Sequence, residues 1–238
     1  MKPTLRHIIT LALIVFFSAY ACNRIWRPVA QYEVHGIDVS HHQQDIDWER
    51  VADQDIAFAF IKATEGATFR DSLFRNNWLQ AKRAGIMRGG YHFFRPATDA
   101  HAQADQFIRE VEMASGDLPP VLDVEVLDGV DRVALLKNMY IWLFRIEIAY
   151  GIKPIIYTNQ KFYNRYLAGY FDDYPLWIAR YNALPPRLLG ESGWDFWQYG
   201  DRARIEGITG PVDVNVYQGS YEQLVQSCLQ PRPVLSAR

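Results

Sequence analysis

Short apolar runs alternate with amphipathic stretches along the first two thirds of this 238-residue chain. Residues 56–62 are apolar almost throughout, which is typical of a strand buried on both faces. Residues 73–84 and 98–113 instead repeat apolar positions at helical spacing, and Gly85 ends the first of these helices. Buried strands that alternate with helices predict a mostly parallel sheet, either closed as a barrel or left open.

Eight strands can be counted along the chain. They are expected at residues 34–40, 56–62, 86–94, 121–126, 153–158, 175–181, 195–200 and 204–216. A long helix over residues 131–150 and a short one near 161–167 separate the middle strands, whereas the last three strands follow one another with little helix between them. We therefore expect one α/β domain, an irregular TIM-like (β/α) barrel of eight strands with the last helices shortened or missing.

Two acidic residues interrupt the apolar run at residues 118–126. In a strand, Asp123 and Glu125 would point to the same side, with Cα atoms roughly 6.5–7 Å apart. Burial beside a like charge raises the pKa of a carboxyl group, and such a group can hold a proton for acid–base hydrolysis near neutral pH. A solvated strand end or a pair of salt-bridge partners would produce the same pattern without catalysis.

A barrel would place its functional side chains at the carboxyl ends of the strands. Every predicted strand carries a polar or aromatic residue there. These are Asp38, Glu65, His92, Asp123 with Glu125, Tyr157, Trp177 or Arg180, Gln198 and Asp213. Acids from four strands can converge at the mouth of a barrel, which favours a carboxylate-based site.

Composition limits the partners and cofactors. The formal net charge of −2 is not basic enough for nucleic acid to be the main partner. The 7 Trp, 14 Tyr and 13 Phe residues suit a sugar- or peptide-binding cleft, although large cores also use aromatic residues. His41 and His42 would point to opposite faces of a strand, and no third well-spaced ligand accompanies them. We therefore expect no metal and no cofactor.

The N-terminus is separate from the barrel. Lys2 and Arg6 precede an apolar run over residues 8–21, which is short for a membrane span and typical of a secretory signal. Cys22 follows a small residue and is a candidate for lipidation, as in bacterial lipoproteins. Ordinary cleavage and an uncleaved anchor are the alternatives.

This pattern divides the chain into a signal or anchor at residues 1–22, a tether at 23–33 and the barrel at 34–238. Only Cys22 and Cys228 are present, so no disulfide framework holds the domain together. We expect an exported protein of the bacterial cell envelope, either secreted or held at the membrane through its N-terminal segment or a lipid.

The chain resembles glycoside hydrolase family 25, the Chalaropsis-type lysozymes or muramidases. The motifs that carry the resemblance lie, in order, at residues 35–40, 60–66, 90–93, 122–125, 156–158, 176–181, 197–199 and 212–215. The resemblance extends from residue 34 to about 217 without a departure at the acidic positions. It implies a single irregular barrel that hydrolyses the β-1,4 bond between N-acetylmuramic acid and N-acetylglucosamine in peptidoglycan. We expect a monomer whose partner is the peptidoglycan glycan strand.

The resemblance also implies roles for individual residues. Glu125 would be the general acid. Asp123 would orient the acetamido group of the substrate for attack on the anomeric carbon, or stabilise oxocarbenium charge. Asp38 and Asp213 are the other two family acids, and one of them would position water or sugar. Candidate substrate-binding residues are Glu65, Tyr91, Tyr157, Trp177, Gln198 and Tyr199, with Lys62 as a nearby counter-charge.

Other functions remain open at this point. A non-catalytic peptidoglycan-binding protein could use the same barrel, although a binding protein has no need of four costly carboxylates. An endo-N-acetylglucosaminidase or a chitin-like specificity is a further alternative. Retention or inversion of configuration also stays open, because the separation of two carboxyl groups decides it only in ordinary glycosidases.

Overall fold

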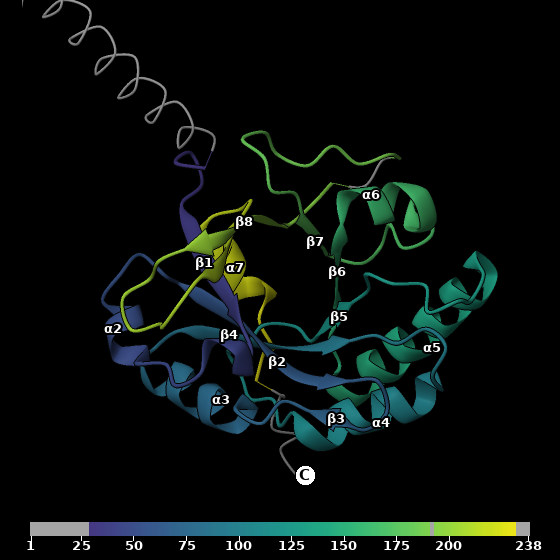
Figure 1. Cartoon of the computed structure of the whole chain (residues 1–238), viewed down its shortest axis with the longest axis horizontal. Coiled ribbons are helices and arrows are strands. Elements are labelled where there is room, and N and C mark those ends of the chain that lie inside the picture. Colours follow the sequence, from purple (N-terminus) through teal and green to yellow (C-terminus); the bar gives the residue numbers. More distant parts are fainter. Residues whose placement is uncertain (1–28, 191–192, 232–238) are drawn as a thin grey trace, which may run out of the picture.

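The computed structural model describes residues 29–190 and 193–231, and it confirms the eight-stranded α/β barrel (Figure 1). Around the barrel the strands follow the order β1-β9-β8-β7-β6-β5-β4-β2, and pairing of β2 with β1 closes the ring. The ninth strand, β3, pairs only with the end of β2. The strands are β1 (Val34–Val39), β2 (Phe58–Glu65), β3 (Phe69–Arg70), β4 (Met87–Phe93), β5 (Val121–Asp123), β6 (Ile155–Asn159), β7 (Leu176–Ala179), β8 (Phe196–Ala203) and β9 (Val212–Tyr217).

Helices lie on the outside of the barrel, with α3, α4 and α5 along one side of it in Figure 1. The helical elements are η1 (His41–Gln43), α2 (Trp48–Ala52), α3 (Phe74–Arg83), α4 (Ala100–Glu110), α5 (Arg132–Tyr150), α6 (Gln160–Phe162), η2 (Tyr163–Leu167) and α7 (Tyr221–Ser227). Between β7 and β9 the described residues contain no helix. The prediction that the last helices are shortened or missing is therefore confirmed.

The direction of the last strand was not predicted. β9 runs antiparallel to both of its neighbours, β1 and β8, whereas we expected one strand over residues 204–216 of a parallel barrel. Instead β8 extends to Ala203 and the chain returns through residues 204–211. A connection this short cannot form the crossover of a dozen or more residues that parallel strands require. The start of β9 therefore lies at the same mouth as the ends of the other strands.

Alternate residues of each strand fill the inside of the barrel, because side chains along a strand alternate with period 2. Near the strand starts, Val34, Phe58, Val121 and Phe196 form a buried apolar cluster, and Leu224 of α7 packs against it. α7 thus closes the end of the barrel opposite the carboxyl mouth. The outward-facing residues form a second, larger core beneath the helices.

Two glycines make room for aromatic rings in the barrel interior. A Cβ atom on Gly36 would lie 2.5 Å from the ring of Phe58, and one on Gly89 would lie 2.7 Å from the ring of Phe60. The Phe60 ring stacks on Trp177 with 4.4 Å between ring centroids. The rings on β2 therefore occupy the space that side chains on β1 and β4 would otherwise fill.

Part of the segment expected to be a tether packs on the barrel. Val29 is buried, and the ring of Tyr32 meets Trp194 and Trp197 edge-on with centroids 5.6 and 6.2 Å apart. The candidate lipidation residue Cys22 and the rest of residues 1–28 lie outside the described residues. Over residues 29–190 and 193–231, no helix is both long and apolar enough to cross a bilayer.

We predict that Gly89→Ala lowers the free energy of unfolding by roughly 1–3 kcal/mol, because the added methyl group overpacks the barrel interior. That group would meet Phe60 at 2.7 Å and Leu118 at 3.2 Å. Gly90→Ala is the matched control, since its Cβ would meet Val111 no closer than 3.4 Å. Urea denaturation measures both variants, and equal midpoints would contradict the packing argument.

Candidate active site

The four predicted acids gather at the carboxyl mouth of the barrel. Asp38 lies on β1 and Asp213 on β9, directly opposite each other in the ladder between these strands. Asp123 ends β5, and Glu125 follows it by two residues. In addition to burial, the charges of Glu125 and Asp38 raise the pKa of Asp123, and the charge of Asp213 raises the pKa of Asp38 and Glu125. Their convergence agrees with the rule that placed them at the strand ends.

Glu125 lies just beyond β5, so the expectation that both acids occupy one strand over residues 121–126 was wrong. β5 ends at Asp123, although the N–H of Val124 still donates to the carbonyl of Tyr157 at 2.9 Å. Beyond that bond the chain leaves the sheet. Glu125 therefore lies at the rim of the barrel, next to a pocket, whereas Asp123 points into the barrel.

Asp38 is held by two amide groups. The Nε2 atom of Gln198 and the Nδ2 atom of Asn215 each donate to Oδ2 of Asp38 at 2.8 Å. Gln198 also donates to Oδ2 of Asp213 at 3.3 Å. Burial and the charge of Asp213 raise the pKa of Asp38 well above its usual value, and the two amide donors oppose that rise. Burial also raises the pKa of Asp213.

The oxygen atoms of the same two amide groups are also hydrogen-bonded. Oε1 of Gln198 accepts hydrogen bonds from the hydroxyl groups of Tyr157 and Tyr181 at 2.8 and 2.9 Å. Oδ1 of Asn215 accepts a bond of 2.8 Å from the indole N–H of Trp177. These donors leave only one amide orientation, in which both nitrogens face carboxylates. Asn215 and Tyr181 were missed among the candidate residues, although both lie within the recognised motifs.

Asp123 and Glu125 both titrate above their usual range. Asp123 is only 5% exposed, and among the described residues no hydrogen-bond partner reaches its Oδ1 atom. Burial, and then the charge of Glu125, raise the pKa of Asp123 well above its usual value. Burial, and then Asp213, raise the pKa of Glu125, which is partly exposed. A partly exposed carboxyl group that keeps its proton can act as a general acid.

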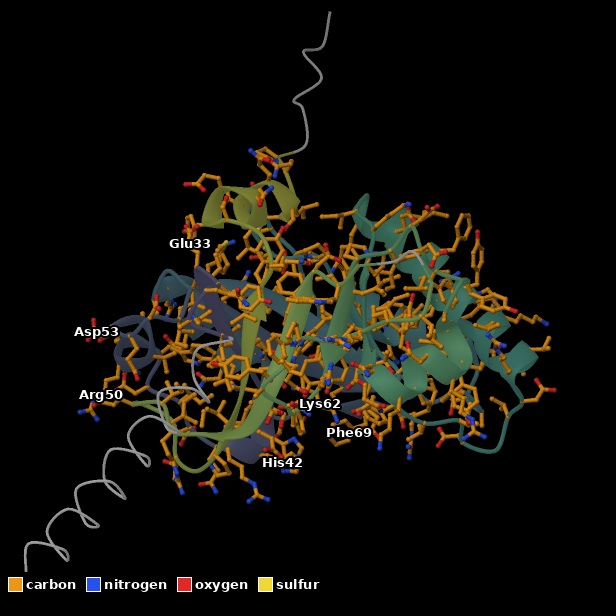
Figure 2. The ribbon with its side chains drawn as sticks, turned by 90° about the horizontal axis from the view of Figure 1, so that it is seen from above. Glu33, His42, Arg50, Asp53, Lys62 and Phe69 are labelled. Carbon is orange, nitrogen blue, oxygen red and sulfur yellow. The ribbon has the colours of Figure 1, made fainter. Side chains whose placement is uncertain are left out.

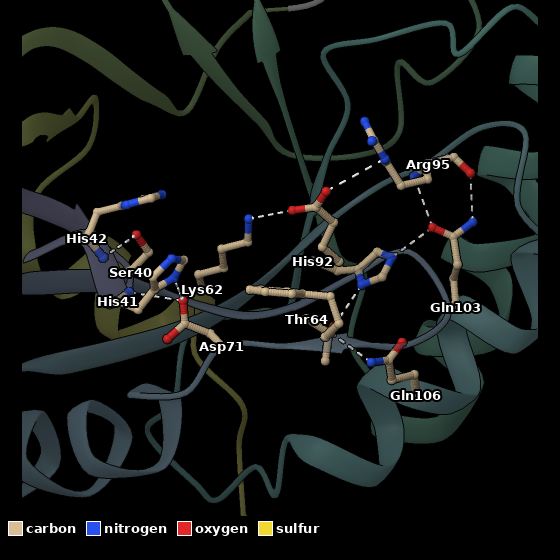
Figure 3. Close-up of polar contacts among 12 residues, drawn as sticks. Ser40, His41, His42, Lys62, Thr64, Asp71, His92, Arg95, Gln103 and Gln106 are labelled. Atoms are coloured by element: carbon tan, nitrogen blue, oxygen red, sulfur yellow. Dashed lines mark hydrogen bonds and ion pairs between the residues drawn. The ribbon is translucent and has the colours of Figure 1, made fainter. Parts of the chain in front are cut away.

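Lys62 lies beside Glu65, and its charge also reaches Asp123 and Glu125. Its Nζ atom lies 2.7 Å from Oε2 of Glu65 and 5.3 and 5.2 Å from the ring centroids of Phe69 and Phe93. Figure 2 labels Lys62 and Phe69 next to each other. The other oxygen of Glu65 is 3.6 Å from Nε of Arg95 (Figure 3). Glu65 thus holds Lys62 in a position where its charge lowers the pKa of the two acids of the 123–125 segment.

A pocket of about 610 Å³ opens beside Glu125. Tyr157, Asn159 and Tyr181 line it together with Glu125, so the general-acid candidate faces the space that a substrate would occupy. Tyr91 lies close to the acids as well, because burial and then the charges of Asp38 and Asp123 raise the pKa of its hydroxyl group.

Of the six predicted substrate-binding residues, Tyr157 lines this pocket, and two of the others, Trp177 and Tyr199, are packed against other rings. Trp177 is buried inside the barrel between Phe60 and Tyr157, with ring centroids 4.4 and 4.3 Å away, so neither ring face is open to a sugar. Tyr199 packs against the outer core beside Trp197, because the residue after an inward Gln198 must point outward. Trp177 supports the site through Asn215, and Tyr199 lies outside it.

The histidines have structural partners. Burial lowers the pKa of His92 to about 4, so this ring is neutral, with Nδ1 2.7 Å from Thr64 Oγ1 and Nε2 3.1 Å from Gln103 Oε1 (Figure 3). His41 and His42 belong to η1, where their ring centroids lie 4.1 Å apart with the planes tilted by 36°, rather than pointing apart as expected. Across residues 29–190 and 193–231, no three His, Cys, Asp or Glu side chains are arranged to hold a metal ion.

We predict that Asp123→Asn raises the thermal stability at pH 7 by roughly 1 kcal/mol, or ~2–4 °C in Tm. The folded-state pKa of Asp123 is raised. Its protonated form therefore contributes stability that is complete below the unfolded pKa of about 3.9 and is lost as the pH rises through the folded pKa.

An asparagine at this position has no charge to bury, so the difference in Tm between Asp123→Asn and the parent should shrink as the pH falls toward 4. Differential scanning calorimetry between pH 7 and pH 4 measures this difference. Asp45→Asn, which removes an exposed carboxylate away from the site, is the control. An Asp123→Asn variant less stable than the parent at pH 7 would contradict the assignment of a strained buried charge.

The sequence profile of glycosyl hydrolases family 25 matches residues 37–208. The chain is 36% identical over 212 residues to Lysozyme M1 of Streptomyces globisporus, covering 83% of this chain and 72% of that protein. It is 45% identical over 203 residues to the uncharacterized protein YegX of Escherichia coli strain K12, covering 83% of this chain and 74% of that protein.

Solved structures agree with the sequence relatives. A family 25 glycosyl hydrolase from Bacillus anthracis superposes with a TM-score of 0.78 at 36% identity, covering 82% of this chain and 94% of that one. A bacterial lysozyme from Streptomyces coelicolor superposes with a TM-score of 0.76 at 34% identity, covering 82% and 96%. The chain belongs to glycosyl hydrolase family 25 and is a glycoside hydrolase.

Proposed function

We propose that the protein is a muramidase that hydrolyses the β-1,4 bond between N-acetylmuramic acid and N-acetylglucosamine in peptidoglycan, with Glu125 as the general acid. The observation that carries the proposal is the Glu125 carboxyl group, which has a raised pKa and lines the pocket at the barrel mouth. The names of the relatives, lysozyme and N,O-diacetylmuramidase, support this choice of substrate.

Glu125 donates its proton to the glycosidic oxygen as the bond to the anomeric carbon breaks. Burial and the charge of Asp213 keep the proton on Glu125, while Lys62 prevents the acid from becoming too weak to release it. A general acid works best when its pKa lies near the working pH. The opposing influences on Glu125 serve that balance.

Asp123 acts on the acetamido group of the sugar. Its unpartnered Oδ1 atom accepts the amide N–H, which directs the acetamido oxygen toward the anomeric carbon. That oxygen forms a bond to the carbon as the glycosidic bond breaks, giving a cyclic intermediate. Water then opens the intermediate and returns a proton to Glu125. A carboxylate at this place also stabilises the positive charge that develops on the sugar ring.

Asp38 and Asp213 form the second pair of acids. Both oxygens of the Gln198–Asn215 amide pair face away from them, and Asp38 receives two amide donors. Asp213 is the more exposed of the pair and positions the water or a sugar hydroxyl. Glu65, Tyr91, Tyr157 and Gln198 remain substrate-binding candidates around the same mouth.

Glu125→Gln should lower the rate of fragment release by about 10²–10⁴-fold, because the amide cannot protonate the leaving oxygen. Wall binding and folding should be unchanged. The assay follows clearing of a peptidoglycan suspension, and mass spectrometry identifies muramic acid at the new reducing ends. Glu112→Gln, at an exposed position outside the pocket, is the matched control.

Each outcome of this assay separates two functions. Wild-type digestion by Glu125→Gln would show that another group is the acid. Wall binding by the wild type without released fragments would favour the non-catalytic binding protein. New reducing ends that carry N-acetylglucosamine instead of muramic acid would assign the protein to the endo-N-acetylglucosaminidases.

Export of the protein and lipidation of Cys22 belong to the same proposal, because peptidoglycan lies outside the cytoplasmic membrane. We expect the full chain in a bacterial host to incorporate labelled palmitate and to fractionate with membranes. Cys22→Ser should lose the label. A mature N-terminus at residue 22 without lipid would show ordinary cleavage, and an intact Met1 in the membrane fraction would show an uncleaved anchor.

A further inference from the structure

Helix α5 has an apolar outer face that the fold does not cover. Its inner face is buried, with Trp142 and Leu143 in the outer core. On the outer face, Tyr140, Phe144 and Ile148 are 59%, 54% and 67% exposed. Surface helices normally carry polar residues on that side. Three large apolar side chains on successive turns therefore indicate a surface with a partner.

A hollow of about 820 Å³ lies between this face and residues 169–174, which follow η2. We call it the flank hollow. Tyr170 and Tyr174 form its second wall. The guanidinium group of Arg132 lies 4.7 Å from the ring centroid of Tyr170, and the hydroxyl group of Tyr174 donates to Oε2 of Glu147 at 3.4 Å. The two walls are therefore tied together, and the aromatic rings are held in place.

Charged groups also line the flank hollow. Glu147, Asp172 and Asp173 contribute carboxylates and Lys153 an ammonium group. The Lys153 Nζ atom donates to the carbonyl oxygen of Asp173 at 3.3 Å and lies 3.9 Å from its carboxylate. An acyl chain or an apolar helix seated here would remove water from these charges without replacing its hydrogen bonds. The excess of carboxylates also opposes an anionic lipid headgroup or an acidic peptide.

We propose that the flank hollow binds the glycan strand of peptidoglycan at a second place, outside the catalytic pocket. This proposal rests on the proposed function. A pyranose ring has an apolar C–H face that packs on exposed aromatic rings, and its hydroxyl and acetamido N–H groups donate to carboxylates. The mixture of rings and acceptors on the two walls matches that chemistry, and the volume of the hollow is typical of a ligand site.

The flank hollow and the catalytic pocket have no lining residue in common. They lie at opposite ends of one connection, since residues 159–161 line the catalytic pocket and 169–174 line the flank hollow. A long or insoluble glycan can contact both places, whereas a short soluble fragment occupies only one. The second contact therefore holds the enzyme on polymeric wall without changing the chemical step.

The test compares Phe144→Ala/Tyr170→Ala with a matched pair, Leu79→Ala/Tyr221→Ala, whose side chains are 54% and 46% exposed on α3 and α7. Full-length proteins are co-sedimented with purified insoluble peptidoglycan and assayed on it and on a soluble muropeptide tetrasaccharide. We expect Phe144→Ala/Tyr170→Ala to bind insoluble wall roughly five-fold or more weakly. It should clear the wall more slowly and cleave the tetrasaccharide at the parental rate. The matched pair should behave as the parent in all three.

Tyr170→Ala alone, which leaves α5 intact, should show the same change to a smaller extent. Unchanged binding and clearing by the double variant would overturn the proposal. So would a parental dimer that the double variant converts to a monomer in light scattering, since the face would then be a subunit interface. A parental protein that releases no fragments from either substrate would instead overturn the proposed function, while loss of wall binding in the double variant would still support the second site.

Discussion

The amide group of Gln198 connects the two halves of the barrel mouth. Its nitrogen donates to Asp38 and Asp213, and its oxygen accepts from Tyr157 and Tyr181. A buried carboxylate pair without donors would lose its charge or force the strands apart. With the amide in place, four strands can bring polar groups to one point while the layer beneath them remains apolar. Such a fully bonded network also gives the core one defined arrangement.

The acids at the mouth work against the stability of the fold. Burial is the largest cause of the raised pKa of Asp38, Asp123, Glu125 and Asp213 alike. The apolar layers of the barrel and the outer core beneath the helices offset that penalty. Active-site groups often lower the stability of the folded state, and the large core compensates for that loss here.

The barrel and the position of its acids could be predicted from the spacing of apolar residues along the sequence. Alternation of apolar runs and helical stretches predicts the barrel, and the strand-end rule places the acids at one mouth. The same period-2 rule, applied to Gln198, would have turned Tyr199 outward. The depth of Trp177 was not predictable, because it depends on the Phe60 ring that fills the space above Gly89.

Other features depend on contacts between distant strands. Asn215 becomes part of the site through the antiparallel pairing of β9 with β1, which the expectation of a parallel barrel did not include. Its amide carries no charge, so a search for acids passed over it. Tyr181 similarly gains its role from Gln198, a residue on the next strand. The local sequence predicts which polar side chains reach the mouth of the barrel. The register of the sheet determines which of them form hydrogen bonds with one another.

The pairing of β9 with β1 joins the beginning of the barrel to its end. Asp38 receives its donors from residues 160 and 177 positions later in the chain. A chain that leaves the ribosome or a translocation channel N-terminus first therefore presents Asp38 long before Gln198 and Asn215 exist beside it. Until β9 inserts, the ring is open and Asp213 is missing from the mouth. The hydrogen bonds that hold Asp38 can therefore form only when nearly the whole barrel sequence is available to fold.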